Sequence, residues 1–107
     1  SDLPIYGGNQ KTMLQRYLIG RLDSIQRDGQ KVKDKMFGTV LIDEIASDCN
    51  LALTEKTVRT LRKDVESIFS DWAAMKTESH LEAWDIAKRG RKIVGWKITV
   101  SARKKKD

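Results

Sequence analysis

The residues best suited to chemistry in this chain are lysines and arginines that gather around one glycine. The segment Lys88-Arg89-Gly90-Arg91-Lys92 places four cations in five positions. Turns favour glycine, but they do not require four like charges, which repel one another unless a polyanion compensates them. We therefore expect these cations to bind the phosphate backbone of a nucleic acid, which supplies affinity and little sequence specificity. The predicted phosphate contacts are Lys88, Arg89, Arg91 and Lys92.

A second group of polar side chains repeats at helical spacing earlier in the chain. Its members, on the side of a predicted helix opposite to the apolar positions, are Lys56, Arg59, Thr60 and Lys63. An arginine on such a face can read guanine through two hydrogen bonds, and a threonine can contact either base edge or a thymine methyl group. The same residues also fit the solvated face of an ordinary amphipathic helix. The sequence leaves both interpretations open.

The sequence offers little for catalysis or metal binding. His80 is the only histidine, and it has no cysteine or histidine neighbour at metal-ligand spacing. Asp43 and Glu44 are adjacent and therefore point to different sides of a helix, which makes them a poor carboxylate pair. The sequence suggests no Ser/His/Asp set and contains no glycine-rich phosphate loop. We therefore predict that the chain is not an enzyme and uses no metal, other cofactor or small-molecule substrate.

The net charge of +6 is concentrated at one end of the sequence. Residues 88–107 hold nine lysines and arginines and one acid, whereas the preceding 87 residues hold 12 lysines and arginines and 14 acids. A nearly neutral body with a strongly basic end indicates a surface directed at a polyanion, such as DNA, RNA or an anionic membrane.

Cysteine content and chain hydropathy indicate the compartment. Cys49 is the only cysteine, so it cannot form an internal disulfide, and a reducing environment is expected. Apolar runs are too short for a membrane span, and residues 1–4 do not resemble the start of a signal peptide. We predict a cytoplasmic protein.

Apolar periodicity predicts the helices that would position these side chains. The first covers residues 10–28, with Asn9 as its N-cap and Gly29 as its stop. Its apolar stripe consists of Met13, Leu14, Tyr17, Leu18, Leu22 and Ile25. A polar connecting loop, with a short strand at its end, is expected over residues 30–38, and a short helix over residues 41–49.

A third helix and a hairpin complete the pattern. The helix follows Thr54, a good N-cap residue, and its apolar face ends at Trp72. From residue 82 to 100 the apolar period changes to two, which predicts a β-hairpin with the basic segment at its tip. Trp84 and Trp96 are in phase with the apolar positions of this hairpin. We therefore expect them, like Trp72, in the core rather than stacked on bases.

The order helix, short helix, turn, longer helix and hairpin is the layout of a winged helix-turn-helix domain. We therefore predict an α+β fold in which the third helix enters the major groove of DNA and the hairpin lies beside it as a wing. The domain would cover residues 9–100. A flexible arm at residues 1–8 would precede it and a basic tail at residues 101–107 would follow it.

The segment from Ile86 to Val100 resembles the last hairpin of winged-helix domains in the initiator replication proteins of iteron-controlled plasmids. There, a strand leads into a Lys-Lys-Gly-Arg-Lys-like tip, and the next strand carries a small residue before an aromatic or aliphatic one, as Gly95-Trp96 does here. Those initiators usually carry two such domains, and this chain has room for one. The resemblance implies that the third helix and the wing bind repeated origin sites, and hence that the protein is associated with the nucleoid or with a plasmid. It also implies a first helix free to take part in dimerisation.

The leading hypothesis is sequence-specific binding of double-stranded DNA, by a replication initiator domain or a transcription regulator. A homodimer would suit such a protein because one module buries limited surface on DNA. The alternative is a winged-helix scaffold for protein–protein interaction that docks an acidic partner. Binding of RNA or single strands would require exposed tryptophans. Binding of a membrane surface is disfavoured because the polar face of the first helix mixes both signs of charge.

Overall fold

A computed structural model describes residues 10–75 and 81–102 and shows a mixed α+β domain. In this part of the chain the helices are α1 (Gln10–Asp28), α2 (Ile42–Asp48) and α3 (Glu55–Met75). The strands are β1 (Gln30–Val32), β2 (Lys35–Leu41), β3 (Leu81–Arg89) and β4 (Lys92–Ser101). The three predicted helices and the predicted C-terminal hairpin are confirmed.

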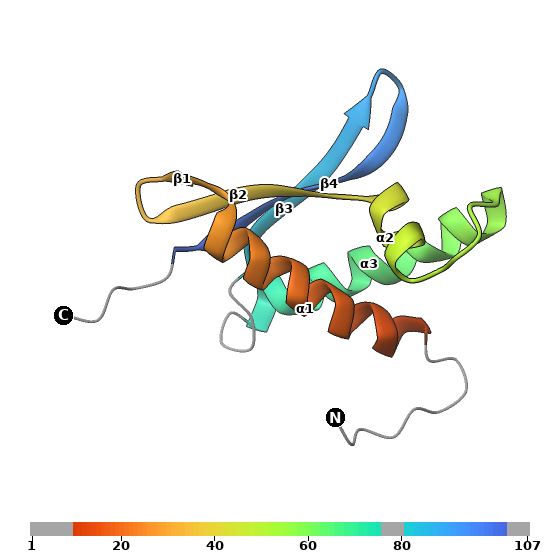
Figure 1. Ribbon diagram of the computed structural model, residues 1–107, viewed down its shortest axis with the longest axis horizontal. Helices are drawn as coiled ribbons and strands as arrows, with labels where there is room; N and C mark the ends of the chain where they lie inside the picture. The colour runs from red at the N-terminus through yellow and green to blue at the C-terminus, as the bar shows by residue number, and fades with distance from the viewer. Residues whose placement is uncertain (1–9, 76–80, 103–107) are drawn as a thin grey trace.

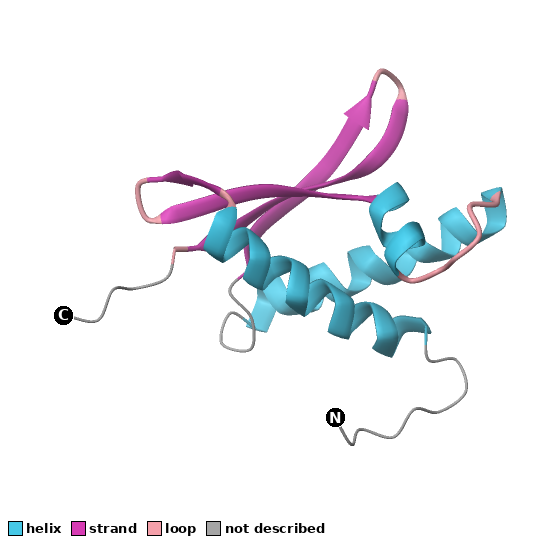
Figure 2. Cartoon of the chain, in the orientation of Figure 1, coloured by secondary structure: helices cyan, strands magenta, loops and turns pink. Residues whose placement is uncertain are grey.

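All four strands belong to one antiparallel sheet with the order β1-β2-β4-β3. Strand β4 is central, because it forms a hairpin with β3 on one side and pairs with β2 on the other, from Lys35↔Ser101 to Leu41↔Gly95. The helices lie on one side of the sheet (Figures 1 and 2). On the opposite side, Phe37, Thr39 and Lys97 are exposed.

The prediction of a connecting loop over residues 30–38 is wrong, whereas the short strand expected at its end is confirmed as part of β2. This segment forms β1, a turn at Lys33 and Asp34, and the first half of β2. The buried side chains of β2 are Met36 and Val40, and the lysines and glycine around them hide the alternation that would identify a strand. Strand β2 is held in place by its ladder with β4, which follows two helices and another strand later in the chain. No local sequence pattern reports such a distant partner.

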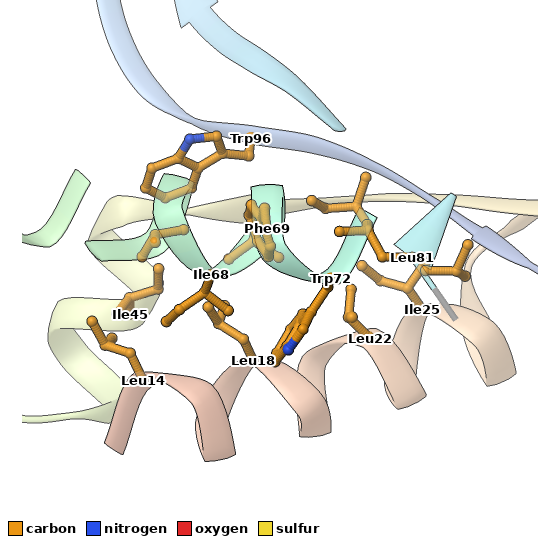
Figure 3. Close-up of a cluster of buried hydrophobic side chains, with 14 of the residues drawn as sticks. Leu14, Leu18, Leu22, Ile25, Ile45, Ile68, Phe69, Trp72, Leu81 and Trp96 are labelled. Atoms are coloured by element: carbon orange, nitrogen blue, oxygen red, sulfur yellow. The ribbon is translucent and has the colours of Figure 1, made fainter. Parts of the chain in front are cut away.

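One hydrophobic core fills the space between the sheet and the two long helices (Figure 3). Phe69 lies at its centre, with its ring centroid 6.3 Å from that of Trp72 and 6.0 Å from those of Trp84 and Trp96. Trp96 is fully buried, Trp72 is nearly so, and Trp84 is partly buried against the same cluster. The prediction that the tryptophans are core residues is confirmed. The helix α1 contributes its predicted stripe, of which Leu14, Leu18, Leu22 and Ile25 are buried.

A polar network fastens α1 to α2 beside this core. The hydroxyl of Tyr17 donates to Oδ2 of Asp48 at 2.6 Å and accepts from Nη1 of Arg21 at 3.0 Å. Nη2 of Arg21 also contacts Oε1 of Glu44 at 3.1 Å, and that oxygen accepts from the backbone N–H of Leu41. Partial burial, reinforced by the hydrogen bond to Asp48, raises the pKa of Tyr17 to about 12. The phenol is therefore protonated at neutral pH and orients α2 relative to α1.

Candidate nucleic-acid interface

The polar side of α3 faces solvent, as its spacing predicts. Its four predicted contact residues, which we call the α3 polar face, are Lys56, Arg59, Thr60 and Lys63, and all are exposed. Leu61 and Val65, on the opposite side of the helix, are fully buried in the core. Burial of one side therefore fixes the direction in which the other side points. Within residues 10–75 and 81–102, no ion pair involves the cations of the α3 polar face.

The start of α3 is fixed by a side-chain cap. Oγ1 of Thr54 accepts a hydrogen bond from the backbone N–H of Thr57 at 3.1 Å, which satisfies one of the free donors at the helix end. This confirms the predicted N-cap. It also orders the first turn of the helix, from which Lys56 projects.

The turn between α2 and α3 has a defined geometry. Asn50 adopts a left-handed conformation with φ 57°, which asparagine tolerates better than most residues. The N–H of Leu51 donates to the carbonyl of Ala46 at 2.8 Å, and the N–H of Asn50 points to the carbonyl of Ser47 at 3.4 Å. These bonds close α2 with a Schellman motif and reverse the chain toward α3. The two helices are therefore joined by a structured turn.

The basic segment forms the tip of the β3–β4 hairpin, and we call residues 88–92 the basic tip. Arg89 pairs with Lys92, and the two-residue turn between them has Gly90 first, with φ 66°. This arrangement is found in type II′ turns, whose twist suits the strands of a hairpin. The four cations of the tip are exposed, and none has an ion pair within the described residues.

A groove of about 300 Å³ lies between the base of the basic tip and the helix–turn–helix segment. Its lining residues come from α2, the turn, α3, and both strands of the hairpin: Ile42, Asp43, Leu53, Val58, Arg89, Lys92, Ile93 and Val94. Arg89 and Lys92 therefore share a surface with the first turns of α3. Asp43 is the one acid among these lining residues, so the groove presents two cations against one carboxylate. The structure thus brings half of the basic tip next to the helix that carries the α3 polar face.

Three residues that the sequence reasoning missed shape this region. Glu66 accepts a hydrogen bond from Nε1 of Trp96 at 3.1 Å and lies 3.6 Å from Nη2 of Arg62. The bond to Trp96 joins α3 to β4 and fixes the rotation of the helix against the sheet. The spacing of Arg62 and Glu66 is the signal that indicates a pair on one helix face. Leu53 is 52% exposed and places an apolar side chain before the start of α3.

The remaining sequence predictions differ in outcome. Cys49 is partly buried and forms no disulfide, and burial raises the pKa of its thiol. Several predictions fall outside the described residues: the arm at residues 1–8, the N-cap at Asn9, His80, and the cations of the predicted tail from Arg103 to Lys106. Ser101, placed in the tail by the sequence, is the last residue of β4.

The described part of the chain contains no group of three or more His, Cys, Asp or Glu side chains able to hold a metal ion. None of its helices combines the length and the apolar character needed to cross a membrane. Comparisons with protein-family models, curated proteins and solved structures found no match to this chain.

Proposed function

We propose that this chain is a winged-helix domain that binds double-stranded DNA. The observation that carries the proposal is the groove that joins the base of the basic tip to the first turns of α3. A winged-helix protein needs this arrangement. The second helix of its helix–turn–helix, here α3, enters the major groove while the hairpin reaches the neighbouring backbone. The strand order supports the assignment, since β2 precedes the helix–turn–helix segment and pairs with the second strand of the hairpin.

The two basic surfaces have different tasks in this proposal. Arg59 and Thr60 lie on an exposed helix face and would contact base edges, which gives sequence preference. Arg89, Arg91 and their neighbours in the basic tip would contact phosphates, which gives affinity and strong salt dependence. The proposal covers a replication initiator and a transcription regulator alike, because both bind duplex DNA in this manner.

The buried tryptophans support duplex DNA over single strands. Proteins that bind single strands without sequence preference stack bases on exposed aromatic side chains. Here the rings of Trp72, Trp84 and Trp96 gather around Phe69, and none of them is among the exposed large hydrophobic residues. The surface beside the basic tip offers cations and aliphatic side chains instead.

Fluorescence anisotropy of a labelled duplex at several salt concentrations tests the proposal. Removing two phosphate contacts with Arg89→Ala/Arg91→Ala should weaken binding and lower the slope of log K against log salt by about 2. Arg16→Ala/Arg27→Ala is the matched control, because it removes the same charge from two exposed positions on α1. The control should bind as the unmodified protein does.

Equal losses in both double variants would mean that net charge, rather than the basic tip, attracts the duplex. Absence of binding at low salt by the folded protein would contradict the proposal and favour the alternative, an acidic protein partner on the same surface.

A further inference from the structure

A second basic hairpin lies at the end of the sheet opposite to the basic tip (Figure 1). It consists of β1, the turn and the start of β2, residues 30–35, and we call it the lysine hairpin. Lys31, Lys33 and Lys35 are exposed there, against Asp34 as the single acid of the segment. Lys35 is partly compensated, because its Nζ lies 3.9 Å from Oε1 of Glu82. Lys31 and Lys33 have no ion pair within the described residues.

The turn of the lysine hairpin holds a cation in an unfavourable conformation. Lys33 has φ 59°, in the left-handed region where a side chain with a Cβ atom is strained and where glycine or asparagine is preferred. The equivalent position of the β3–β4 turn is Gly90, which adopts φ 66° without that strain. Strained positions of this kind are concentrated at functional sites. A positive charge at the turn of the lysine hairpin is therefore present despite a cost in stability.

The end of the central strand is attached to the same turn. The backbone N–H of Ala102 donates to the carbonyl of Asp34 at 2.9 Å, so the end of β4 is attached to the lysine hairpin. The sheet therefore carries one basic hairpin at each of its two ends, the basic tip and the lysine hairpin.

The basic tip and the lysine hairpin are too far apart to act as one electrostatic surface. Strand β4 connects them, and ten residues of extended chain span about 30 Å. The Debye length in physiological salt is about 8 Å, so exposed charges at the two ends are screened from each other. The sheet surface between them mixes signs, since Lys97 pairs across the strands with Asp85 on one side and with Thr39 on the other. A polyanion held at one end therefore leaves the other end available.

We propose that the lysine hairpin is a second contact site for the phosphate backbone of nucleic acid, so that one chain holds two duplex segments. The inference rests on the proposed function, because it takes the basic tip and α3 as the site of the first duplex. Lys31 and Lys33 are the residues that bind phosphate at the second site. Their contacts are to the backbone alone and carry no sequence preference.

A bridging experiment tests this inference on the full chain. Short duplexes labelled with a donor dye and others labelled with an acceptor dye are mixed with the protein, and energy transfer reports chains that hold both. Single-duplex affinity is measured in parallel by anisotropy. Lys31→Gln/Lys33→Asn removes both charges and places at the turn a residue that accepts a left-handed conformation. Lys31→Arg/Lys33→Arg is the control that keeps the charge.

The expected result is bridging by the unmodified protein and by the arginine variant, with a loss of at least about tenfold in the neutral variant. Affinity for a single duplex should stay within about twofold, because the substituted positions are distant from the basic tip. Single-duplex binding without bridging, or bridging that persists in the neutral variant, would overturn the inference and leave the proposed function standing. Failure to bind any single duplex would overturn both.

Discussion

The two hairpins of the sheet make the same kind of tight turn with different residues. Each has a two-residue turn whose first residue has positive φ, 66° at Gly90 in the basic tip and 59° at Lys33 in the lysine hairpin. The basic tip uses the residue that accepts this conformation without strain, and its cations surround the glycine. The lysine hairpin places a cation at the strained position itself. In the basic tip the charges therefore leave the turn unstrained, whereas in the lysine hairpin the charged residue itself bears the strain.

The hairpins also differ in what supports them. Strands β3 and β4 are long, and their side chains Leu81, Trp96 and Ile98 are buried in the core. In contrast, β1 is three residues long and buries none of its side chains, so it depends on its pairing with β2. The basic tip is therefore supported by burial and the lysine hairpin by backbone hydrogen bonds. Since β4 pairs with both β2 and β3, damage to β4 should affect the two hairpins together.

The largest effect is expected from Trp96→Ala. Trp96 is fully buried, contacts Phe69 and donates to Glu66, so its removal leaves a cavity and takes one hydrogen bond from the Glu66 carboxylate. The free energy of unfolding should fall by about 3–5 kcal/mol, measured by urea denaturation. If both hairpins depend on β4, hydrogen exchange at their turns should rise together. An increase confined to one turn would show that they are supported independently.

The next largest effect is expected on DNA selectivity, and it should differ between α3 and the lysine hairpin. Arg59→Ala should cost about 1–3 kcal/mol on a preferred sequence and much less on a random duplex, because it removes a base contact. Lys31→Gln at the other end should leave the ratio of the two affinities unchanged. Competition binding with specific and random duplexes measures this affinity ratio for each variant. A change in the ratio for Lys31→Gln would contradict the assignment of base reading to α3 alone.

A smaller loss is expected at the turn of the basic tip. Gly90→Ala adds a Cβ atom at φ 66°, where there is space around it but the backbone conformation is strained. The expected cost is about 1–2 kcal/mol in thermal or chemical unfolding. Retained stability would indicate that the turn relaxes to another geometry, and in that case the hairpin amide signals in NMR spectra should shift.

The smallest expected effect is a gain at the turn of the lysine hairpin. Lys33→Asn replaces a strained residue by one that visits the left-handed region readily, which should raise the free energy of unfolding by about 0.5–1 kcal/mol. The gain would be accompanied by a loss of bridging between duplexes. Unchanged stability would show that the turn bears no strain and would remove one of the differences between the hairpins.

The sequence predicted the elements that have a local signal, such as an apolar stripe, a cap residue or a turn glycine. The helix α1 follows from its apolar stripe, α3 from Thr54 and its buried face, and the basic tip from Gly90 between two strands of period two. The exposure of the α3 polar face also follows from the sequence, because burial of one helix side determines the opposite side. The DNA-binding role of these residues stays a prediction, as does the resemblance to plasmid initiators.

Only the tertiary structure decided how these elements are placed relative to one another. The lysine hairpin exists because β2 pairs with β4, and the groove exists because Arg89 and Lys92 come to lie beside Val58. Likewise, the hydrogen bond from Trp96 to Glu66 forms because α3 packs against β4. All of these contacts join residues far apart in the chain, whereas periodicity, caps and turns report on neighbours. The sequence therefore determined which segments are helical, apolar or basic, and the packing against β4 decided where the basic tip and the lysine hairpin lie in the fold.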